Sequence, residues 1–418
     1  MSLLPCTPRP DRLDVFQSES CSILAGMRLT RLSGFVVAAA SVAAAQSARP
    51  TPTQAQAQQS AVWQMQDAGT TAGLRGIDSV DGTVAWASGT DGTVLKTTDG
   101  GAHWTKCAVP DGDKDGATLD FRGVQAWDAM TAIVMASGPG EKSRLYKTTD
   151  GCKSWALLIK NPDAPNGFFD SFWLNGSRGM LLGDPVGGRF AVFRTTTSGK
   201  TWKREPQQGL SLHERNLAAF AASNSCVARG NRLFVWAFAT GGKSGAMLFS
   251  RLRDPEEEGT TGLIGKVTRK KADWKSNRIA VGTGSESSGA FSISYRYPVT
   301  TGICQDCGFG ENARFIVVGG DYLKPDNSAG TAASSSDGGW TWTASIVPPH
   351  GYRSTVQWSA DLKLWITAGT NGSDISRDDG RTWQPLDDGN WNALSLPFIV
   401  GPKGRIARLN PAALPREK

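Results

Sequence analysis

The chain has 418 residues, of which 39% are hydrophobic and 20% are charged, as in ordinary globular proteins. Its formal charge of +7 is modest for this length, and its longest basic run is Arg269 to Lys271, which argues against nucleic-acid binding. The 49 glycines and 15 tryptophans favour a turn-rich protein built from repeats.

The first 45 residues are predicted to be an N-terminal extension and a secretory signal peptide. Residues 1–26 contain no apolar core, whereas Met27, a candidate true start, opens a basic segment that leads into an apolar run over 35–45. That run is too short to span a bilayer, and small residues before Gln46 suit cleavage there. Residues 46–60, rich in Pro, Gln and Ala, read as a linker.

One eight-residue phrase recurs along the rest of the chain. It opens with Ser or Thr, has Asp two positions later and then Gly, and ends on Trp. Four copies begin at Thr97, Thr148, Ser335 and Ser376, and a fifth copy, at Thr195, has lost the Asp. Short polar side chains accept hydrogen bonds from nearby backbone N–H groups, and Gly supplies a positive φ. Each phrase therefore predicts a structural hairpin turn.

The phrases recur about every 40–50 residues, which is the length of one propeller blade. The longer gap between Trp202 and Trp342 contains Trp274, and we expect two enlarged blades there. Their insertions would be residues 253–271 and the loop that carries Cys304 and Cys307.

The last repeat, residues 392–409, lacks both the phrase and an outer strand. Residues 61–66 resemble the strand that follows each phrase, so the N-terminal strand is expected to complete the last blade and remove exposed sheet edges. The sequence thus predicts an all-β fold, a seven-bladed β-propeller with four-stranded antiparallel blades. It would span 61–410 as a single domain and leave a tail at 411–418.

Five cysteines lie beyond residue 45, namely Cys107, Cys152, Cys226, Cys304 and Cys307. An odd number in an exported protein implies at least one unpaired thiol or an intermolecular bond. Two cysteines separated by two residues, at 304 and 307, could suggest metal or redox chemistry. No second such pair exists and the chain has only three His, so no metal or cofactor is predicted.

The candidate binding residues fall on one face of the predicted propeller. Loops that lead into the first strand of each blade, and loops that join its second and third strands, emerge opposite the recurring phrases. Alignment of the repeats puts Arg75, Arg122 and Arg353 at the same axial position of three blades, with Asp170 and Asn392 there in two others. The rim loops add Asp184, Arg189, Asp321, Tyr322, Lys324 and Lys403.

Guanidinium groups that converge on a narrow funnel favour a carboxylate or another anion. The alternative is that each arginine bridges to a neighbouring blade and holds the ring together.

The phrases Arg75-Gly-Ile and Arg122-Gly-Val, the turn at Thr97 and the segment 401–406 resemble those of the photosystem II stability/assembly factor family. These are BNR/Asp-box β-propellers of the sialidase-like superfamily, and the resemblance covers residues 61–409. It implies an exported, non-catalytic factor that contacts a membrane-protein precursor through an arginine-rich patch. We therefore expect a monomer, periplasmic, secreted or in the thylakoid lumen, that binds a protein client or a small anionic ligand.

A sialidase-like glycoside hydrolase is the alternative that the resemblance also suggests. Such enzymes use an arginine triad, a Tyr nucleophile helped by Glu, and an Asp acid/base. Arg75, Arg122 and Arg353 could form the triad, and Tyr322 or Tyr352 could act with Glu214 or Glu286, although the early Arg-Ile-Pro motif of that family is absent.

Overall fold

The computed structural model describes residues 61–206, 208–213, 215–229, 236–251, 274–297 and 313–416. The chain divides into two compact units, 1–51 and 52–418, and every described residue belongs to the second. The predicted signal peptide and linker, both insertions, Glu214, Cys304 and Cys307 lie outside the described residues.

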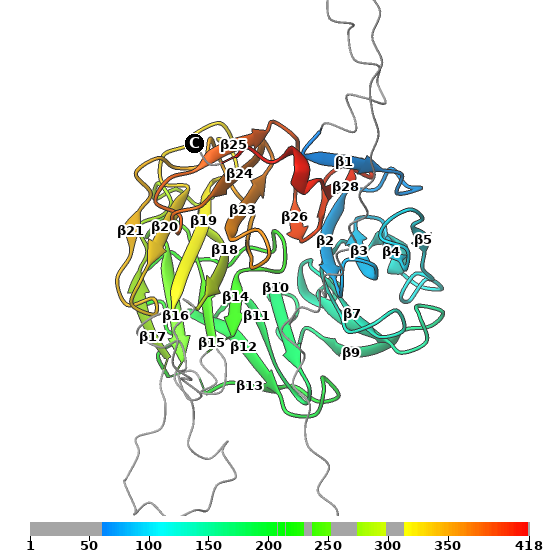
Figure 1. Cartoon of the computed structure of the whole chain (residues 1–418). Coiled ribbons are helices and arrows are strands. Elements are labelled where there is room, and N and C mark those ends of the chain that lie inside the picture. Colours follow the sequence, from blue (N-terminus) through cyan, green and yellow to red (C-terminus); the bar gives the residue numbers. More distant parts are fainter. Residues whose placement is uncertain are drawn as a thin grey trace, which may run out of the picture. The chain divides into compact units, whose positions relative to one another are not determined.

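The described residues form seven four-stranded antiparallel sheets, which confirms the predicted seven-bladed propeller. In Figure 1 the first strands surround the centre of the ring and the fourth strands lie at its rim. Blade 1 comprises β2 (Leu74–Ser79), β3 (Ala85–Gly89), β4 (Val94–Thr97) and β5 (Thr105–Lys106), and blade 2 comprises β6 (Phe121–Ala126), β7 (Ala132–Ala136), β8 (Arg144–Thr148) and β9 (Ala156–Lys160). Blade 3 comprises β10 (Phe169–Asn175), β11 (Arg178–Val186), β12 (Arg189–Thr195) and β13 (Lys203–Arg204).

The two enlarged blades follow. Blade 4 comprises β14 (Val227–Arg229), β15 (Trp236–Ala239), β16 (Met247–Arg251) and β17 (Trp274–Arg278), and blade 5 comprises β18 (Ser288–Arg296), β19 (Arg314–Asp321), β20 (Ala332–Ser335) and β21 (Thr343–Ala344). Blade 6 comprises β22 (Thr355–Ser359), β23 (Leu364–Gly369), β24 (Gly372–Ser376) and β25 (Gln384–Asp387). Trp274 begins the outer strand of blade 4, as predicted from its place in the long gap.

Blade 7 joins the two ends of the domain. It comprises β26 (Ala393–Ser395), β27 (Phe398–Val400), β28 (Ile406–Leu409) and β1 (Trp63–Gln66). β1 pairs antiparallel with β28, so that Trp63 lies opposite Leu409, and Figure 1 shows β1 in blue beside β28 in red. The indole of Trp63 is buried and donates a hydrogen bond of 2.9 Å to the Ser373 hydroxyl of blade 6. The predicted closure of the ring by the N-terminal strand is confirmed.

The core lies between successive blades. Middle strands such as β7, with the sequence Ala-Ile-Val-Met-Ala, are buried at every position because each blade is covered on both faces by its neighbours. The buried side chains of Trp86 in blade 1 and Phe121 and Val134 in blade 2 belong to one cluster. Full burial of a side chain such as Val134 contributes about 1.5–3 kcal/mol.

Helices contribute little to the described residues. They are three 3-10 turns, η1 (Gly116–Thr118), η2 (Gly140–Lys142) and η4 (Pro411–Ala413). In the part of the chain that the structure describes, no helix is long and apolar enough to cross a membrane.

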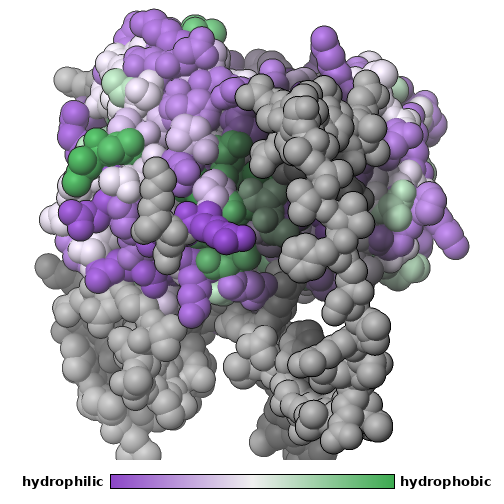
Figure 2. Space-filling model, turned by 45° about the horizontal axis from the view of Figure 1, so that its top comes forward, coloured by the Kyte–Doolittle hydropathy of each residue, from purple (hydrophilic) through white to green (hydrophobic). Residues whose placement is uncertain are grey.

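Hydrophilic side chains dominate the face seen in Figure 2, with smaller hydrophobic areas among them.

The recurring phrases lie between the third and fourth strands of their blades. In the first, the Asp99 carboxylate accepts hydrogen bonds of 2.8 Å from the Thr97 hydroxyl and 2.9 Å from the His103 backbone N–H. In the fifth copy, Thr197 stands where the others have Asp, and its hydroxyl accepts a hydrogen bond of 2.9 Å from the Thr201 N–H. A hydroxyl oxygen thus replaces the carboxylate oxygen in that turn.

A disulfide joins the first two blades. Cys107 follows β5 of blade 1, and Cys152 lies in the turn between β8 and β9 of blade 2. Cys152 occupies a position that is Gly in the other copies and has a φ of 70°. Within the described residues Cys226 is the free cysteine; it is fully buried, and burial raises the pKa of its thiol to about 12.

Candidate functional site

The axial position of four blades is set by a β-bulge in the first strand. The pairing register shifts around Arg75 in β2, Arg122 in β6, Asp170 in β10 and Phe291 in β18. A bulge leaves its residue out of the ladder and changes the direction of its side chain. These four residues therefore occupy equivalent positions at the centre of the ring.

Arg353 is not at that position, which corrects the alignment made from the sequence. Leu74, Trp391 and Arg353 each donate a backbone N–H to a glycine carbonyl of the preceding blade, at 2.9–3.0 Å. Arg353 therefore corresponds to the buried Leu74, and the equivalent of Arg75 in blade 6 is Ser354. The phrases Leu-Arg-Gly and Tyr-Arg-Ser look alike, but their strands begin one residue apart.

The guanidinium group of Arg353 is a structural centre of blade 6. It is 0% exposed, and its Nε donates to the Asp374 carboxylate at 2.6 Å. Its NH1 donates to Asn371 Oδ1 at 2.5 Å, and NH2 lies 2.9 Å from His350 Nδ1. Burial lowers the pKa of Arg353, and the Asp374 charge opposes that shift. A ligand in solution has no access to this group, so its role is structural, although its partners lie within blade 6 and not in a neighbouring blade as the alternative expected.

Arg75 and Arg122 share one carboxylate. Arg122 Nε donates to Asp120 Oδ2 at 2.8 Å, and Arg75 Nε lies 3.8 Å from Asp120 Oδ1. The side chains of the arginines are 37% and 30% exposed, and within the described residues their terminal nitrogens make no hydrogen bond. Two positive charges thus face one negative charge, with donors left over for an anion.

Asp170 holds the equivalent position in blade 3, close to Arg122. Its carboxyl is fully buried, and Oδ2 has no hydrogen-bond partner. Burial raises its pKa well above the ordinary value, repulsion from Asp184 raises it further, and Arg122 opposes both. Asp184, whose carboxylate accepts a hydrogen bond from the Ala219 N–H, has a pKa raised to about 6 by burial. Burial thus disfavours the charged form of Asp170.

The other half of the centre is aromatic. Phe220 stacks on Phe291 with ring centroids 3.9 Å apart, and Phe291 meets Tyr352 edge-on at 4.9 Å. Tyr322 lies 6.1 Å from Phe291 and is 47% exposed, and the adjacent Leu323 is 70% exposed. This half presents apolar surface to a ligand.

The aromatic and charged halves adjoin one another. Burial strongly raises the pKa of Tyr352, and the nearby Arg75 charge opposes that rise. We call this whole region the axial mouth. It consists of Arg75, Asp120, Arg122, Asp170, Phe220, Phe291, Tyr322 and Tyr352.

The remaining predicted residues divide into structural and exposed groups. The buried Asp321 accepts hydrogen bonds from two serine hydroxyls and so stabilises a loop. Asn392 Nδ2 donates to a carbonyl of blade 1 at 2.7 Å and so stabilises the contact between blades 7 and 1. Lys324 and Lys403 are exposed in loops, and Arg189 is exposed at the first position of β12.

The sequence analysis missed Asp120, Phe220 and Phe291 as site residues. Asp120 directly precedes the phrase that contains Arg122, and Phe291 holds in blade 5 the position of Arg75. A search for charged residues alone could not select the two phenylalanines.

Comparison with known proteins supports this architecture. No family model matches the chain. Over 147 residues it is 26% identical to the photosystem II assembly lipoprotein Ycf48 of Synechococcus sp. (strain CC9902), and the match covers 34% of this chain and 40% of that protein. The chain thus spans less than half the length of this curated relative.

Two solved structures share the fold over most of the chain. YCF48 bound to D1 peptide has a TM-score of 0.51 and 19% identity, covering 83% of this chain and 96% of that one. YCF48 from Cyanidioschyzon merolae has a TM-score of 0.53 and 17% identity, covering 84% and 100%. The resemblance to photosystem II assembly factors, predicted from the motifs, is thus supported in sequence over part of the chain and in fold over most of it.

Proposed function

We propose that this protein is an exported, non-catalytic binding module that holds a segment of a client protein at the axial mouth. The observation that carries the proposal is the pair Arg75 and Arg122, which share the carboxylate of Asp120 beside an aromatic cluster whose Tyr322 is exposed. Unused guanidinium donors favour a carboxylate, and the aromatic half favours an apolar side chain beside it. The ligand is then an acidic and apolar peptide segment of the client.

The comparisons support a protein client rather than a small ligand. A structure with the same fold holds a D1 peptide, and the curated relative is a photosystem II assembly lipoprotein. By analogy the client is a membrane-protein precursor.

Export is supported by two observations. An apolar run follows the basic segment at Met27, and the disulfide between Cys107 and Cys152 is typical of oxidising compartments. The protein would then work in the periplasm, outside the cell or in the thylakoid lumen. In blade 7 the pairing of β1 covers β28 and leaves the short strand β1 as the outer edge, which supports a monomer.

The geometry gives the glycoside hydrolase alternative little support. An arginine triad needs three guanidinium groups around one anion, and Arg353 is buried in its pair with Asp374. Tyr352 is buried with a strongly raised pKa, and Glu286 forms an exposed ion pair with Lys243. Neither Tyr352 nor Glu286 is in the environment that a nucleophile and its helper need.

Selection from a displayed library of random peptides, with the full chain as bait, tests the proposal. We expect the enriched peptides to carry carboxylates beside aliphatic or aromatic side chains. Replacement of Arg75 and Arg122 together by Gln should weaken the binding of these peptides about tenfold or more. The control Lys203→Gln with Arg381→Gln removes the same charge from exposed positions elsewhere.

Two outcomes contradict the proposal. One is that the enriched peptides bind the mouth variant as well as they bind the natural protein. The other is turnover of an aryl sialoside that the mouth variant loses, which would favour the enzyme.

A further inference from the structure

A second cationic region, which shares no lining residue with the axial mouth, lies in the loops of blades 3 to 5. It consists of two adjoining hollows of about 600 and 620 Å³ that share Arg215. Lys243 and Arg278 line one hollow, and Arg189 and His213 line the other. No Asp or Glu is among the described residues that line either hollow. We call this pair of hollows the basic groove.

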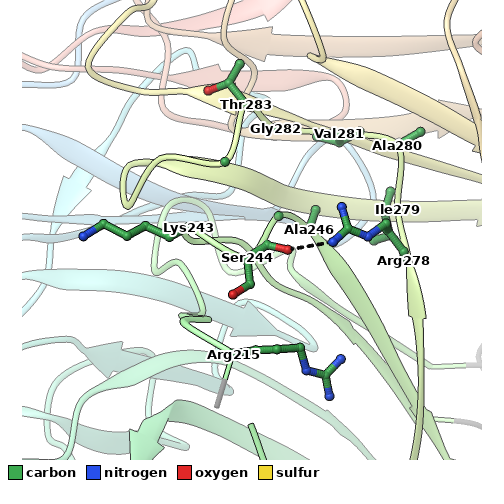
Figure 3. Close-up of a pocket in the computed structure, with 12 residues that line it drawn as sticks. Arg215, Lys243, Ser244, Ala246, Arg278, Ile279, Ala280, Val281, Gly282 and Thr283 are labelled. Carbon is green, nitrogen blue, oxygen red and sulfur yellow. Dashed lines mark hydrogen bonds between the residues drawn. The ribbon is translucent and has the colours of Figure 1, made fainter. Parts of the chain in front are cut away.

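The three cations of the first hollow come from separate segments (Figure 3). Arg278 is the last residue of β17, Lys243 lies in the loop between β15 and β16, and Arg215 lies in the segment that joins blades 3 and 4. Arg278 NH2 donates to the Ser244 carbonyl at 3.2 Å, and Arg215 Nε donates to the Leu212 carbonyl at 3.0 Å. These bonds hold the two guanidinium groups in place, and their other donors have no hydrogen-bond partner among the described residues.

Lys243 is only weakly committed to its partner. Its Nζ lies 2.7 Å from Glu286 Oε1, but the two side chains are 59% and 69% exposed. Exposed ion pairs contribute little free energy, so a ligand carboxylate can compete for Lys243.

The backbone of the groove is not arranged to hold a single phosphate. The N–H groups of Thr283 and Ser285 both donate to the Ser288 hydroxyl, and that of Gly282 donates to a carbonyl of the neighbouring loop at 2.9 Å. A phosphate site built from successive backbone N–H groups needs those donors free. Recognition therefore depends on the separated side-chain cations, which suit several spaced anionic groups.

Small residues, mostly Gly, Ser and Ala, lie between the cations, together with four aliphatic residues. Leu212 and Leu217 line one hollow, and Ile279 and Val281 line the other. No Phe, Tyr or Trp is among the described lining residues, so the large stacking surface that sugar rings favour is lacking there. An extended peptide with spaced carboxylates fits this surface better than a charged glycan.

We infer that the basic groove is a second binding site, for an extended acidic peptide segment, and that it acts independently of the axial mouth. Because its cations are partly exposed, binding is electrostatic and is screened over about 10 Å at 0.1 M salt.

The test is fluorescence anisotropy with the full chain and a labelled octaglutamate peptide, at about 50 mM and about 300 mM salt. The natural protein should bind, and binding should weaken as salt rises. Arg215→Gln with Arg278→Gln should raise the Kd about tenfold, whereas Lys203→Gln with Arg381→Gln should change it less than about twofold.

Further variants keep the outcome decisive. Lys243→Gln removes only an exposed ion pair, so it should fold normally and raise the Kd about threefold. Arg75→Gln with Arg122→Gln should raise the Kd for octaglutamate less than the groove variant does, because octaglutamate lacks the apolar side chain that the axial mouth also favours. Loss of binding in this mouth variant but not in the groove variant would overturn the groove and leave the mouth intact. Two other results would also overturn the groove proposal. One is that octaglutamate does not bind at low salt. The other is that inorganic phosphate, added at the same concentration of negative charge, abolishes octaglutamate binding.

Discussion

The disulfide between Cys107 and Cys152 predicts a large and measurable stabilisation. It joins blades 1 and 2 across a sequence separation of 45 residues. By the chain-entropy estimate, closing a loop of this length restricts the unfolded chain enough to contribute about 4 kcal/mol at 25 °C. Replacement of both cysteines by Ser should therefore lower the free energy of unfolding by about 4 kcal/mol.

The backbone at Cys152 provides a matched control. Its φ is 70°, and the same position in the other copies is Gly101, Gly199, Gly339 or Gly380, all with positive φ. A side chain in this left-handed region costs about 1–2 kcal/mol, whereas Gly costs little there in the folded state. After allowance for the greater freedom of Gly in the unfolded chain, Cys107→Ser with Cys152→Gly should be about 0.5–1 kcal/mol more stable than the Ser pair.

Urea unfolding followed by tryptophan fluorescence measures both differences. Reductant should destabilise the natural protein to the level of the Ser pair and leave the Ser pair unchanged. Two results would refute the reasoning. One is a Ser pair as stable as the oxidised protein, and the other is a Gly variant no more stable than the Ser variant.

Three further predictions concern closure and pH. Deleting 46–70 removes β1 and should cause aggregation through the exposed edge of β28, whereas deleting 46–60 should leave a monomer; light scattering after size exclusion distinguishes the two. Hydrogen bonds from His103 lower the pKa of Asp99 to about 2. The contribution of the Asp99 carboxylate to the stability of the fold is therefore complete above about pH 4 and is lost as pH falls through 2. Urea unfolding of Asp99→Asn should show no such loss. Parallel curves of unfolding free energy against pH for the variant and the natural protein would contradict this. The hydrogen bond to Asp374 raises the pKa of His350, so the contribution of His350 to stability is complete below about pH 6.5 and declines as pH rises through the folded pKa. His350→Asn should flatten that decline in the free energy of unfolding. An unchanged pH profile in the variant would contradict this prediction.

The fold could be predicted because its signals are repeated and local. Each turn phrase, such as that at Thr97, specifies one hairpin, and the regular spacing specifies one blade. The closure by β1 followed from a missing outer strand at one end of the domain and a spare strand at the other. These features depend on short segments, so a decayed copy such as that at Thr195 did not obscure the pattern.

The site was harder to predict because it depends on a register of one residue. Arg353 and Arg75 occur in similar phrases, yet the bond from the Arg353 N–H to blade 5 puts this arginine at the buried position. Its partner Asp374 lies on β24, across the blade, where no local pattern links the two residues. The partners of a buried charge are set by strand pairing, and the phrase alone does not show them.

The contrast between adjacent positions explains how one fold carries different binding functions. At the buried position, large apolar residues such as Leu74 and Phe169 fill the space between blades, and Arg353 is accepted there only with a full set of partners. At the next position, the bulge holds the backbone whatever the side chain, so Arg122, Asp170 and Phe291 can all occupy it. The fold constrains the first position and leaves the second free. If clients bind at the axial mouth as proposed, a propeller of the same fold could bind another client by changing only the residues at the bulges.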